Sequence, residues 1–415
     1  MEKATTLQQC VFTLDTGALN NDNFDLFYTL FQNKYRTDIV KKIDYKLKTL
    51  DLNNFPVQSD KKIYSKFILA GHRGVGKSTE LLRVSKLCRG YETVFVDAEA
   101  ASGQESTEYT NLLVLIAEQI MKFGVDKGYL DKDDDAFEGL LHYWRINTNI
   151  KGEINSSSMT SSNVDEIVHT VINKNDKLFI GAMNSMISKL QAKMGDKRLL
   201  LIIEELDKAG QFRLAEEIFI RKLNVFTSIE CDIIFTYPVH LLYAPSYAHV
   251  RDNVNDIFTL GVIELLDDEG YYISDAVDAF KELIYKRIDE GLIEERALEK
   301  AIKMSGGLIR DAFTIISEAA MNADIDGLEQ ITMDYIMEAI KPLEDRYSKY
   351  IGIKDGYDKV AEIVGKPYLQ IDDELRELLR AEVVLEYSQS RYFVHPIVIN
   401  FLKKTNRVVK EYRDR

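Results

Sequence analysis

Residues 66–87 read KFILAGHRGVGKSTELLRVSKL, and this stretch decides the fold. The short apolar run Lys66–Ala70 predicts a strand, and Thr79–Leu87 carries apolar residues at the spacing of a helix. Between them, Gly71–Ser78 matches the pattern G-x-x-x-x-G-K-[ST], which binds phosphate when it joins a strand to a helix. We therefore predict a phosphate-binding loop, called the P-loop below, within an α/β domain.

The residue types of the P-loop follow from the chemistry of a bound phosphate. Glycines allow successive backbone N–H groups to turn inward around the anion, and the N-terminus of the following helix adds a favourable dipole. Lys77 is expected to reach the β- and γ-phosphates and Ser78 a Mg²⁺ ion, while His72 is expected to face solvent. The residues predicted to bind the nucleotide here are Gly71, His72, Arg73, Gly74, Val75, Gly76, Lys77, Ser78 and Thr79.

An acidic segment follows another apolar run and supplies groups that hydrolysis needs. Leu199–Ile203 predicts a buried strand, and Glu204, Glu205 and Asp207 come directly after it. We assign Glu204 to the metal ion and Glu205 to the attacking water, because one carboxylate can hold Mg²⁺ while the next polarises water. Asp is the usual residue at the first position, so hydrolysis could be slow, or the metal role could pass to Asp207. The alternative is a solvated acidic helix start.

Three further polar residues are candidates for contact with the nucleotide. Thr236 ends the predicted strand Asp232–Thr236, where its hydroxyl can contact the γ-phosphate or the attacking water; a turn cap is the alternative. Arg310 lies early in a predicted helix and can reach the phosphates, unless it is solvated or paired with Asp311. Arg251 is a candidate for an arginine offered to the nucleotide of a neighbouring subunit.

Strands and helices alternate through the first part of the chain. Apolar runs at Thr93–Asp97, Leu199–Ile203 and Asp232–Thr236 have the length of parallel strands that are buried on both faces. Helical spacing marks Tyr109–Phe123 and Asp176–Met194. The predicted fold class is therefore α/β with a doubly wound parallel sheet.

The remaining segments have other patterns. Residues 21–50 predict one or two surface helices, and residues 273–340 predict several more. Val383–Tyr387 and Tyr392–Val394 flank a polar turn and predict a hairpin. Residues 129–175 are acidic and then polar, with too few apolar residues to order themselves, which favours a mobile loop or a partner-binding insertion.

The composition excludes several classes of protein. The chain has 415 residues, of which 46% are hydrophobic, enough for the cores of roughly two or three domains. The chain has 53 Lys and Arg residues and 67 Asp and Glu residues. The resulting net charge of −14 rules out a generally basic surface that coats nucleic acid. The three cysteines cannot form a disulfide framework, which fits a reducing compartment, and Cys88 and Cys231 are expected to be packed thiols. No apolar stretch approaches about 20 residues and no secretion signal is visible, so we expect a cytoplasmic protein without a membrane span.

Five stretches together resemble the AAA+/STAND group of ATPases, nearest to its origin-recognition-like branch and to bacterial proteins described as AAA family ATPases. They are GHRGVGKSTELLR (71–83), LLLIIEELDKAG (199–210), IIFTYPVHLLY (233–243), SGGLIRDAFTIISEA (305–319) and VHPIVINFL (394–402). The first two are specific, and the others gain weight from their order and spacing. The resemblance covers about residues 20–405.

The resemblance implies an ASCE-type P-loop core sheet, a helical lid that carries a second sensor arginine, a C-terminal winged helix, and ATP as the nucleotide. It divides the chain into a helical segment at 1–60, an ATPase core at 61–265 with its polar insertion, a lid at 266–345 and a winged-helix-like domain at 346–415. It also implies that Tyr35, Arg36 and Ile39 lie near the adenine.

These inferences together predict an ATP- and Mg²⁺-dependent molecular switch. Lys77 and Arg310 would clamp the phosphates, and the nucleotide state would govern self-association or a protein effector, by analogy in bacterial defence or stress response. An alternative is a DNA-binding initiator or transposition-type ATPase that uses its winged helix and the basic residues Lys403, Lys404 and Arg407. A third hypothesis is a nucleotide-binding scaffold without turnover.

Overall fold

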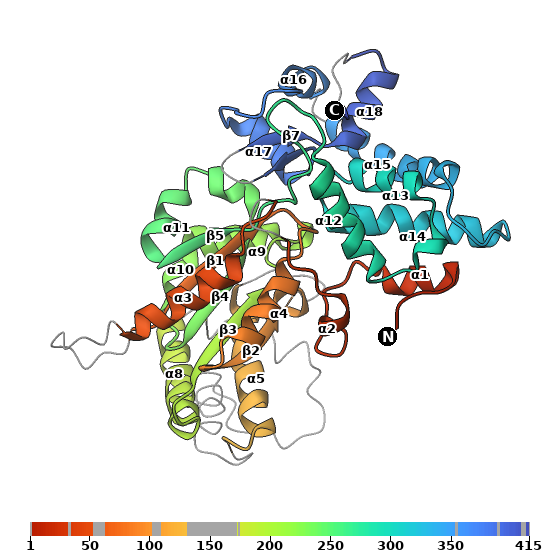
Figure 1. Ribbon diagram of the computed structural model, residues 1–415. Helices are drawn as coiled ribbons and strands as arrows, with labels where there is room; N and C mark the ends of the chain where they lie inside the picture. The colour runs from red at the N-terminus through yellow and green to blue at the C-terminus, as the bar shows by residue number, and fades with distance from the viewer. Residues whose placement is uncertain are drawn as a thin grey trace, which may run out of the picture.

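The computed structural model describes residues 2–31, 35–52, 63–101, 109–130, 172, 175–352, 356–387, 391–407 and 412–414. Most of the insertion at 129–175 lies outside these residues, so its predicted role stays a prediction. Figure 1 shows three groups of elements: a sheet with its covering helices, a bundle of helices beside it, and a smaller C-terminal group above both.

The first group is built on a parallel sheet whose strands are β1 (Lys66–Gly71), β2 (Tyr91–Asp97), β3 (Arg198–Glu204), β4 (Asp232–Pro238) and β5 (Asp256–Thr259). Their order is β2-β3-β4-β1-β5, and every neighbouring pair is parallel. The strand before the P-loop, β1, is therefore separated from the acidic strand β3 by β4. This is the strand arrangement of an ASCE-type sheet, and the predicted α/β fold class is confirmed.

The strands are buried on both faces, which explains their continuous apolar sequences. All six residues of β1 and all seven residues of β4 are buried. Side chains alternate along each strand, so Ile68 and Phe235 belong to the core on one face, while Phe67 and Ile234 belong to the core on the other. The sheet therefore needs a helical layer on each side.

Two layers of helices supply this cover. One layer consists of α5 (Tyr109–Asp126), α8 (Asp176–Lys193), α9 (Phe212–Glu216), η3 (Glu217–Lys222) and α10 (Leu223–Thr227). The other consists of α3 (Ile39–Leu52) and α4 (Lys77–Leu87). Shorter helical turns complete the group: η1 (Ala98–Ala101), η2 (Ala209–Gln211), η4 (Val239–Tyr243) and α11 (Tyr247–Asn253). Because α4 begins directly after the P-loop, that loop lies at the carboxyl edge of the sheet, where parallel strands end.

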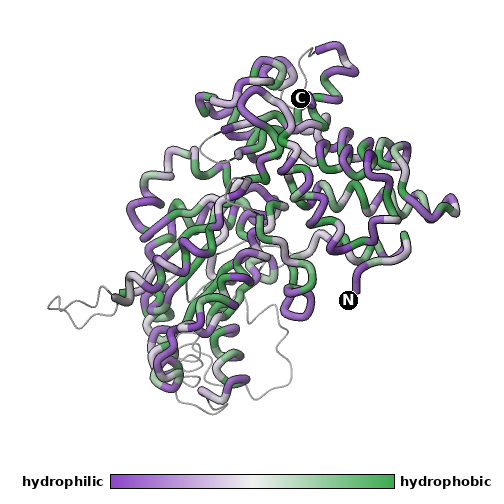
Figure 2. The backbone as a smooth tube through the Cα atoms, viewed as in Figure 1, coloured by the Kyte–Doolittle hydropathy of each residue, from purple (hydrophilic) through white to green (hydrophobic). Residues whose placement is uncertain are grey.

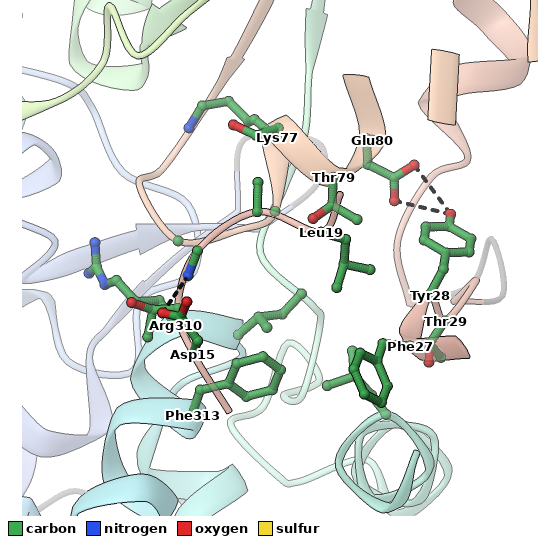
Figure 3. Close-up of a pocket in the computed structure, with 18 of the residues that line it drawn as sticks. Asp15, Leu19, Phe27, Tyr28, Thr29, Lys77, Thr79, Glu80, Arg310 and Phe313 are labelled. Carbon is green, nitrogen blue, oxygen red and sulfur yellow. Dashed lines mark hydrogen bonds between the residues drawn. The ribbon is translucent and has the colours of Figure 1, made fainter. Parts of the chain in front are cut away.

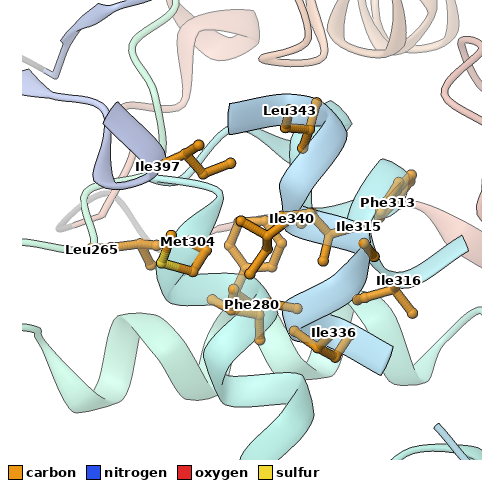
Figure 4. Close-up of a cluster of buried hydrophobic side chains, with 14 of the residues drawn as sticks. Leu265, Phe280, Met304, Phe313, Ile315, Ile316, Ile336, Ile340, Leu343 and Ile397 are labelled. Carbon is orange, nitrogen blue, oxygen red and sulfur yellow. The ribbon is translucent and has the colours of Figure 1, made fainter. Parts of the chain in front are cut away.

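A bundle of helices lies beside the sheet (Figure 1). Most of it is formed by residues 273–340, for which the sequence predicts helices. It contains α12 (Ser274–Tyr285), η5 (Glu290–Leu292), α13 (Glu295–Met304), α14 (Ile309–Ile325) and α15 (Met333–Gly352). Phe280, Ile316 and Ile340 belong to its buried core (Figure 4). The N-terminal helix α1 (Leu7–Thr13) packs on α14, so the start of the chain belongs to this bundle (Figure 1).

Residues 14–31, which we call the N-terminal strap, lead from the bundle toward the sheet. The strap includes the short helix α2 (Phe24–Phe27). Arg287 of the bundle donates a hydrogen bond to the backbone oxygen of Phe27 at 3.0 Å, and the hydroxyl of Tyr28 donates to Glu80 of α4 at 3.2 Å. The strap therefore contacts both groups.

The C-terminal group contains α16 (Tyr357–Ile363), α17 (Asp373–Arg380), β6 (Val384–Glu386), β7 (Tyr392–Val394) and α18 (Pro396–Lys404). Strands β6 and β7 pair antiparallel with Val384 opposite Val394, and the predicted hairpin is confirmed. Helix α18 packs on α15, and α17 packs on the turn η4 that follows β4. The C-terminal group thus contacts both the bundle and the sheet group, while its identity as a winged helix stays a prediction.

Burial follows hydropathy throughout the described residues. Figure 2 shows that apolar residues gather along the strands and between the packed helices. Cys10, Cys88 and Cys231 are free and buried, and burial raises the pKa of each thiol to about 12. They are packed thiols, as predicted for Cys88 and Cys231. Across the described ranges, no helix is long and apolar enough to cross a membrane.

Candidate nucleotide-binding site

The P-loop has the backbone geometry that a phosphate requires. Gly74 and Gly76 have φ angles of 83° and 93°, in the left-handed region that glycine adopts without strain. A Cβ atom at Gly74 would lie 2.5 Å from the Cβ atom of Arg310, so this position needs glycine for space as well. Helix α4 begins at Lys77, and the N–H groups of its first turn are therefore available to an anion in the loop.

Lys77 is buried at the centre of the loop. Its Nζ atom donates to the backbone oxygens of Gly71 at 2.9 Å and His72 at 2.8 Å. The same atom lies 2.7 Å from Asp207 Oδ2, and the lysine and aspartate side chains are only 5% and 7% exposed. The fold thus brings the acidic segment onto the P-loop, where Asp207 pairs with the lysine that is predicted to hold phosphate.

Glu204, the last residue of β3, and Glu205, which follows it, have different surroundings. Burial raises the pKa of Glu204 to about 7, against a hydrogen bond with Ser78 that lowers it. Its Oε1 atom is buried without a hydrogen-bond partner among the residues described. Burial also raises the pKa of Glu205, whose carboxylate lies 3.4 Å from Lys208 Nζ. A buried carboxylate that bonds a serine and keeps one oxygen without a partner fits a hard cation such as Mg²⁺. A carboxylate of raised pKa fits a proton acceptor.

A metal ion at this site would need further ligands from the nucleotide. In the part of the chain that the structure covers, no three His, Cys, Asp or Glu side chains are grouped closely enough to hold a metal ion. Mg²⁺ is usually held by one or two protein ligands together with phosphate oxygens and water. Ser78 and Glu204, which contact each other, fit this pattern, whereas Asp207 is paired with Lys77.

Buried ion pairs support the P-loop from the side of α3. Arg36 donates to the backbone oxygen of Val75 at 2.9 Å and to Glu80 at 3.1 Å. Arg83 of α4 pairs with Asp38 at 2.8 Å. These charges are largely removed from water, so each pair fixes its partners strongly in place. Arg36 therefore holds the backbone of the loop itself.

A cavity of about 550 Å³ lies beside the P-loop. Its charged lining includes Lys77 and Glu205. Leu19 of the N-terminal strap and the rings of Phe27 and Phe313 line it as well (Figure 3), and the guanidinium of Arg287 lies over both rings. The lining thus offers charged groups for phosphates and aromatic and apolar groups for a base.

The sequence does not mark the N-terminal strap as part of a binding site. Residues 15–20 and 27–29 line the cavity. They carry no motif tied to a ligand, so only folding places them beside the P-loop. Of the three residues that the resemblance places near the adenine, Arg36 lines the cavity, while Tyr35 and Ile39 are buried and do not line it.

Arg310 reaches the P-loop from the bundle. It lies in the first turn of α14, and its backbone N–H donates to the oxygen of Gly74 at 3.2 Å. Its guanidinium donates to two acids, Asp311 at 3.2 Å and Glu382 of the C-terminal group. Burial alone would lower the pKa of Arg310, but Glu382 and Asp311 raise it above the ordinary value. The structure therefore brings Arg310 to the site with its charge already paired.

Thr236 and Arg251 lie outside the cavity. Thr236 is buried, and its hydroxyl accepts a hydrogen bond from the N–H of Leu206 at 3.1 Å and donates to the oxygen of Ile203 at 3.3 Å. It thus fixes the backbone of the acidic segment. Arg251 is exposed on α11 and pairs with Asp252 at 3.3 Å. Direct contact of either residue with a nucleotide stays a prediction.

His72 corrects one expectation. It is buried, with 2% of its surface exposed, and its Nε2 atom accepts a hydrogen bond from the backbone N–H of Glu386 at 2.8 Å. Burial lowers the pKa of His72 to about 3, so the ring is neutral and can accept this bond. The expectation of a solvent-facing ring is wrong because β6, which is distant in sequence, packs against the P-loop.

Several solved structures are similar to this chain at low sequence identity. Cdc6p from Pyrobaculum aerophilum is 13% identical, with a TM-score of 0.41, over 93% of this chain and 99% of that one. The ORC2 protein of Aeropyrum pernix, solved as ADPNP and ADP complexes, is 13% identical, with a TM-score of 0.46, over 94% and 97%. The RuvB Holliday junction branch migration motor of Thermotoga maritima is 12% identical, with a TM-score of 0.38, over 93% and 99%.

The chain is similar in fold to origin-recognition and RuvB proteins. The strand order of the sheet agrees with the ASCE-type core that the sequence resemblance implies. At 12–13% identity, the likeness to these structures carries no activity, substrate or partner to this chain. No family model matches the chain, and no curated protein matches it. Its role has to be inferred from its own residues.

Proposed function

We propose that this chain is an ATP- and Mg²⁺-dependent molecular switch that hydrolyses ATP. The observation that carries the proposal is the meeting of three separate parts of the chain at one cavity: the P-loop with Lys77, the acidic segment with Glu205, and the bundle with Arg310. A nucleotide in this cavity would contact all three. Its phosphates would then favour one arrangement of sheet and bundle over another, which is what a switch requires.

The P-loop would bind the phosphates by exchanging partners. Lys77 already gathers two backbone oxygens and the carboxylate of Asp207, so phosphate oxygens would replace acceptors of similar geometry. The exchange would release Asp207 toward the metal side of the site. Mg²⁺, held by Ser78 and Glu204, would supply charge that neutralises the phosphates.

Glu205 is the group proposed to orient and deprotonate the attacking water. It lines the cavity, and burial raises its pKa, which makes its carboxylate a stronger proton acceptor. Its φ of 67° lies in the left-handed region, where a residue with a side chain is strained, and such strain is concentrated at functional sites. Thr236 would assist by holding the backbone on either side of Glu205 through its bonds to Ile203 and Leu206.

The proposed output of the switch is a protein contact, either with a second copy of the chain or with an effector. Arg251 is the residue proposed to enter the site of a neighbouring copy. Its side chain is 65% exposed and that of its partner Asp252 is 66% exposed, so this surface pair would hold the arginine only weakly.

A DNA-binding role through the basic C-terminal residues has less support. Lys404 lies 2.6 Å from Glu344, and Arg407 lies 3.2 Å from Asp358. Glu344 is 10% exposed and holds a cation that would otherwise meet a phosphate backbone. We therefore regard DNA binding as the less supported of the two proposals, after binding of a protein partner.

Nucleotide binding and phosphate release by the purified chain test the proposal. The wild type is expected to bind ATP with Mg²⁺ and to release phosphate, whereas Lys77→Ala is expected to keep its fold and lose binding. Lys177→Ala, which removes an exposed lysine of α8, is the matched control. A wild-type chain that binds no ATP would contradict the proposal, and binding without any phosphate release would leave the scaffold hypothesis.

Light scattering separates the two proposed outputs. The chain is measured without nucleotide, with ADP, and with ATP and Mg²⁺, in the wild type and in Glu205→Gln. Growth to a larger assembly with ATP supports self-association, and Arg251→Ala is then expected to prevent it. An unchanged size in every state would exclude nucleotide-driven self-association and favour an effector.

A further inference from the structure

We propose that Glu382 is an internal competitor of the nucleotide: it holds Arg310 away from the phosphates, so that the C-terminal group sets the affinity for ATP. The inference rests on the function proposed above and adds regulation of the same site by residues 382–386. Two hydrogen bonds connect this short segment to the P-loop region. One runs from Arg310 to Glu382, and the other from the backbone of Glu386 to His72.

Arg310 lies between two cavities. The first is the nucleotide cavity, and the second, of about 390 Å³, is lined by Glu382 and Arg380 on its C-terminal side. Arg310 lines both cavities, as does Arg73 of the P-loop. Its guanidinium can therefore leave Glu382 on one side and meet a phosphate on the other by rotating its side chain, without repacking the hydrophobic core.

The pair between Arg310 and Glu382 is strong but incompletely satisfied. The two side chains are 15% and 14% exposed, so their charges attract each other with little screening by water. The second carboxylate oxygen, Oε1 of Glu382, is buried without a hydrogen-bond partner among the described residues. A phosphate offers more charge and more acceptor oxygens than this carboxylate, so it can displace Glu382 from the arginine.

Asp311, the other acid beside Arg310, has partners of its own. It is completely buried, accepts a hydrogen bond from the hydroxyl of Tyr347 at 2.7 Å, and lies 3.4 Å from His395 Nε2. These partners keep Asp311 in place whichever way the arginine turns. Glu382 is therefore the acid whose release frees Arg310 for the nucleotide.

Glu382 follows Ala381, the C-cap of α17, at a position where helices often end in a left-handed residue. Its φ of 60° lies in the left-handed region, which glycine adopts far more readily. A glutamate at this position is held against the preference of its backbone. The same feature provides a useful variant, because Glu382→Gly removes the carboxylate and relieves the strain together.

The bond between His72 and Glu386 connects the same segment directly to the P-loop. Glu386 is anchored through its carboxylate, which accepts a hydrogen bond from Tyr243 at 2.6 Å, and Tyr243 in turn accepts one from Tyr392 at 2.7 Å. The segment thus joins the P-loop to the turn after β4 and to the hairpin. If ATP stabilises one arrangement of this segment, that arrangement must bind ATP more tightly by the same free energy.

Affinity for ATP with Mg²⁺ tests the proposal in wild type, in the single variants Glu382→Gln, Glu382→Gly and Arg310→Ala, and in the combined and control variants named below. Both substitutions of Glu382 are expected to tighten binding about tenfold, because the competitor is gone while the arginine remains. The gain is expected to vanish when each is combined with Arg310→Ala. Glu374→Gln, which changes an exposed acid of α17, is the matched control and should leave affinity unchanged.

Hydrogen exchange in the absence of nucleotide supplies an independent readout. The amides of residues 382–386 are expected to exchange faster in Glu382→Gln than in wild type, and adding ATP should produce the same change in wild type. A purely structural role of Glu382 would instead lower the melting temperature and weaken ATP binding.

The outcomes distinguish this inference from the function on which it rests. Unchanged or weaker ATP binding in both Glu382 variants, with normal binding by wild type, would overturn the inference and leave the proposed function intact. Absence of binding by wild type would overturn both. Tighter binding that persists without Arg310 would also overturn the inference, because the gain could not then pass through the arginine.

Discussion

Lys77 and Arg310 are two cations at the edge of one cavity, yet different parts of the molecule hold them. Lys77 is held from within the α/β core, by Asp207 and by two carbonyl oxygens of its own loop. Arg310 is held from outside that core, by Glu382 of the C-terminal group. These three partners of the lysine lie at one edge of one sheet, whereas the arginine joins three groups of elements.

This difference separates binding from its regulation. A pair within one packed core changes when a ligand replaces one partner, because close packing holds the elements that carry the pair in place. A pair between separate groups changes whenever either group moves. We therefore expect substitutions around Lys77 to decide whether nucleotide binds and reacts, and substitutions around Arg310 to decide how tightly it binds.

The largest effect is expected within the core. Glu205→Gln should lower the rate of phosphate release by about 100-fold or more, since an amide cannot accept the proton of water. Binding of ATP should change little, and single-turnover assays beside equilibrium binding measure both. Glu217→Gln, an acid of the same group outside the cavity, is the control. A variant as fast as wild type would show that Glu205 is not the proton acceptor.

Loss of Lys77 is expected to have an effect of similar size, on ATP binding instead of on the rate of phosphate release. Lys77→Ala should weaken ATP binding by about 100-fold, because a buried charge that contacts phosphate is removed. The thermal transition should remain cooperative, since the substitution opens no hydrophobic core. Isothermal titration calorimetry checks the affinity, and binding within a few-fold of wild type would contradict the role given to the P-loop.

The C-terminal side should respond to pH through Glu386. Burial raises its pKa from 4.5 to about 7, so the folded chain favours the protonated form. The stability that this adds is present in full below about pH 4.5 and is lost as the pH rises through about 7. Relative to Glu386→Gln, wild type should lose up to about 3 kcal/mol of unfolding free energy between pH 4.5 and pH 8.

Urea denaturation of both chains at the two pH values measures this difference. The comparison cancels the many other groups that titrate over the same range. Glu374→Gln should run parallel to wild type, because that side chain is exposed. Equal pH dependence in wild type and Glu386→Gln would mean that the carboxyl of Glu386 titrates as an ordinary surface group does.

The smallest effect is expected at Arg310 itself. Arg310→Ala should weaken ATP binding only about tenfold, because gaining a phosphate contact costs the arginine its contact with Glu382. The same titration as for Lys77→Ala checks this, with Arg296→Ala of the bundle as the control. A loss as large as that of Lys77→Ala would erase the distinction between the two cations.

Elements with strong local patterns agree closely between sequence and structure. The predicted strand Lys66–Ala70 appears as Lys66–Gly71, and the predicted hairpin appears with β6 and β7 in the expected places. These segments are short, apolar and bounded by turns, so their local preferences already agree with the fold. The P-loop belongs with them, because its glycines and lysine are contiguous.

The contacts of the candidate site that join residues distant in sequence could not be predicted from local patterns. The sequence suggests Asp207 only as a possible metal ligand. Its ion pair with Lys77 is visible only in the structure. His72 was expected at the surface and is covered by β6. Glu382 carries no motif at all, and nothing local signals that it faces Arg310.

The amino-acid sequence alone predicts the α/β class, the P-loop and the acidic segment that follows a neighbouring strand. Those features arise from residues close in the chain, where hydropathy period and glycine conformation act directly. Only the tertiary structure decided that the N-terminal strap lines the cavity, that β6 buries His72, and that Glu382 holds Arg310. Those contacts join residues far apart in sequence, and their partners are chosen by how whole groups of helices and strands pack together.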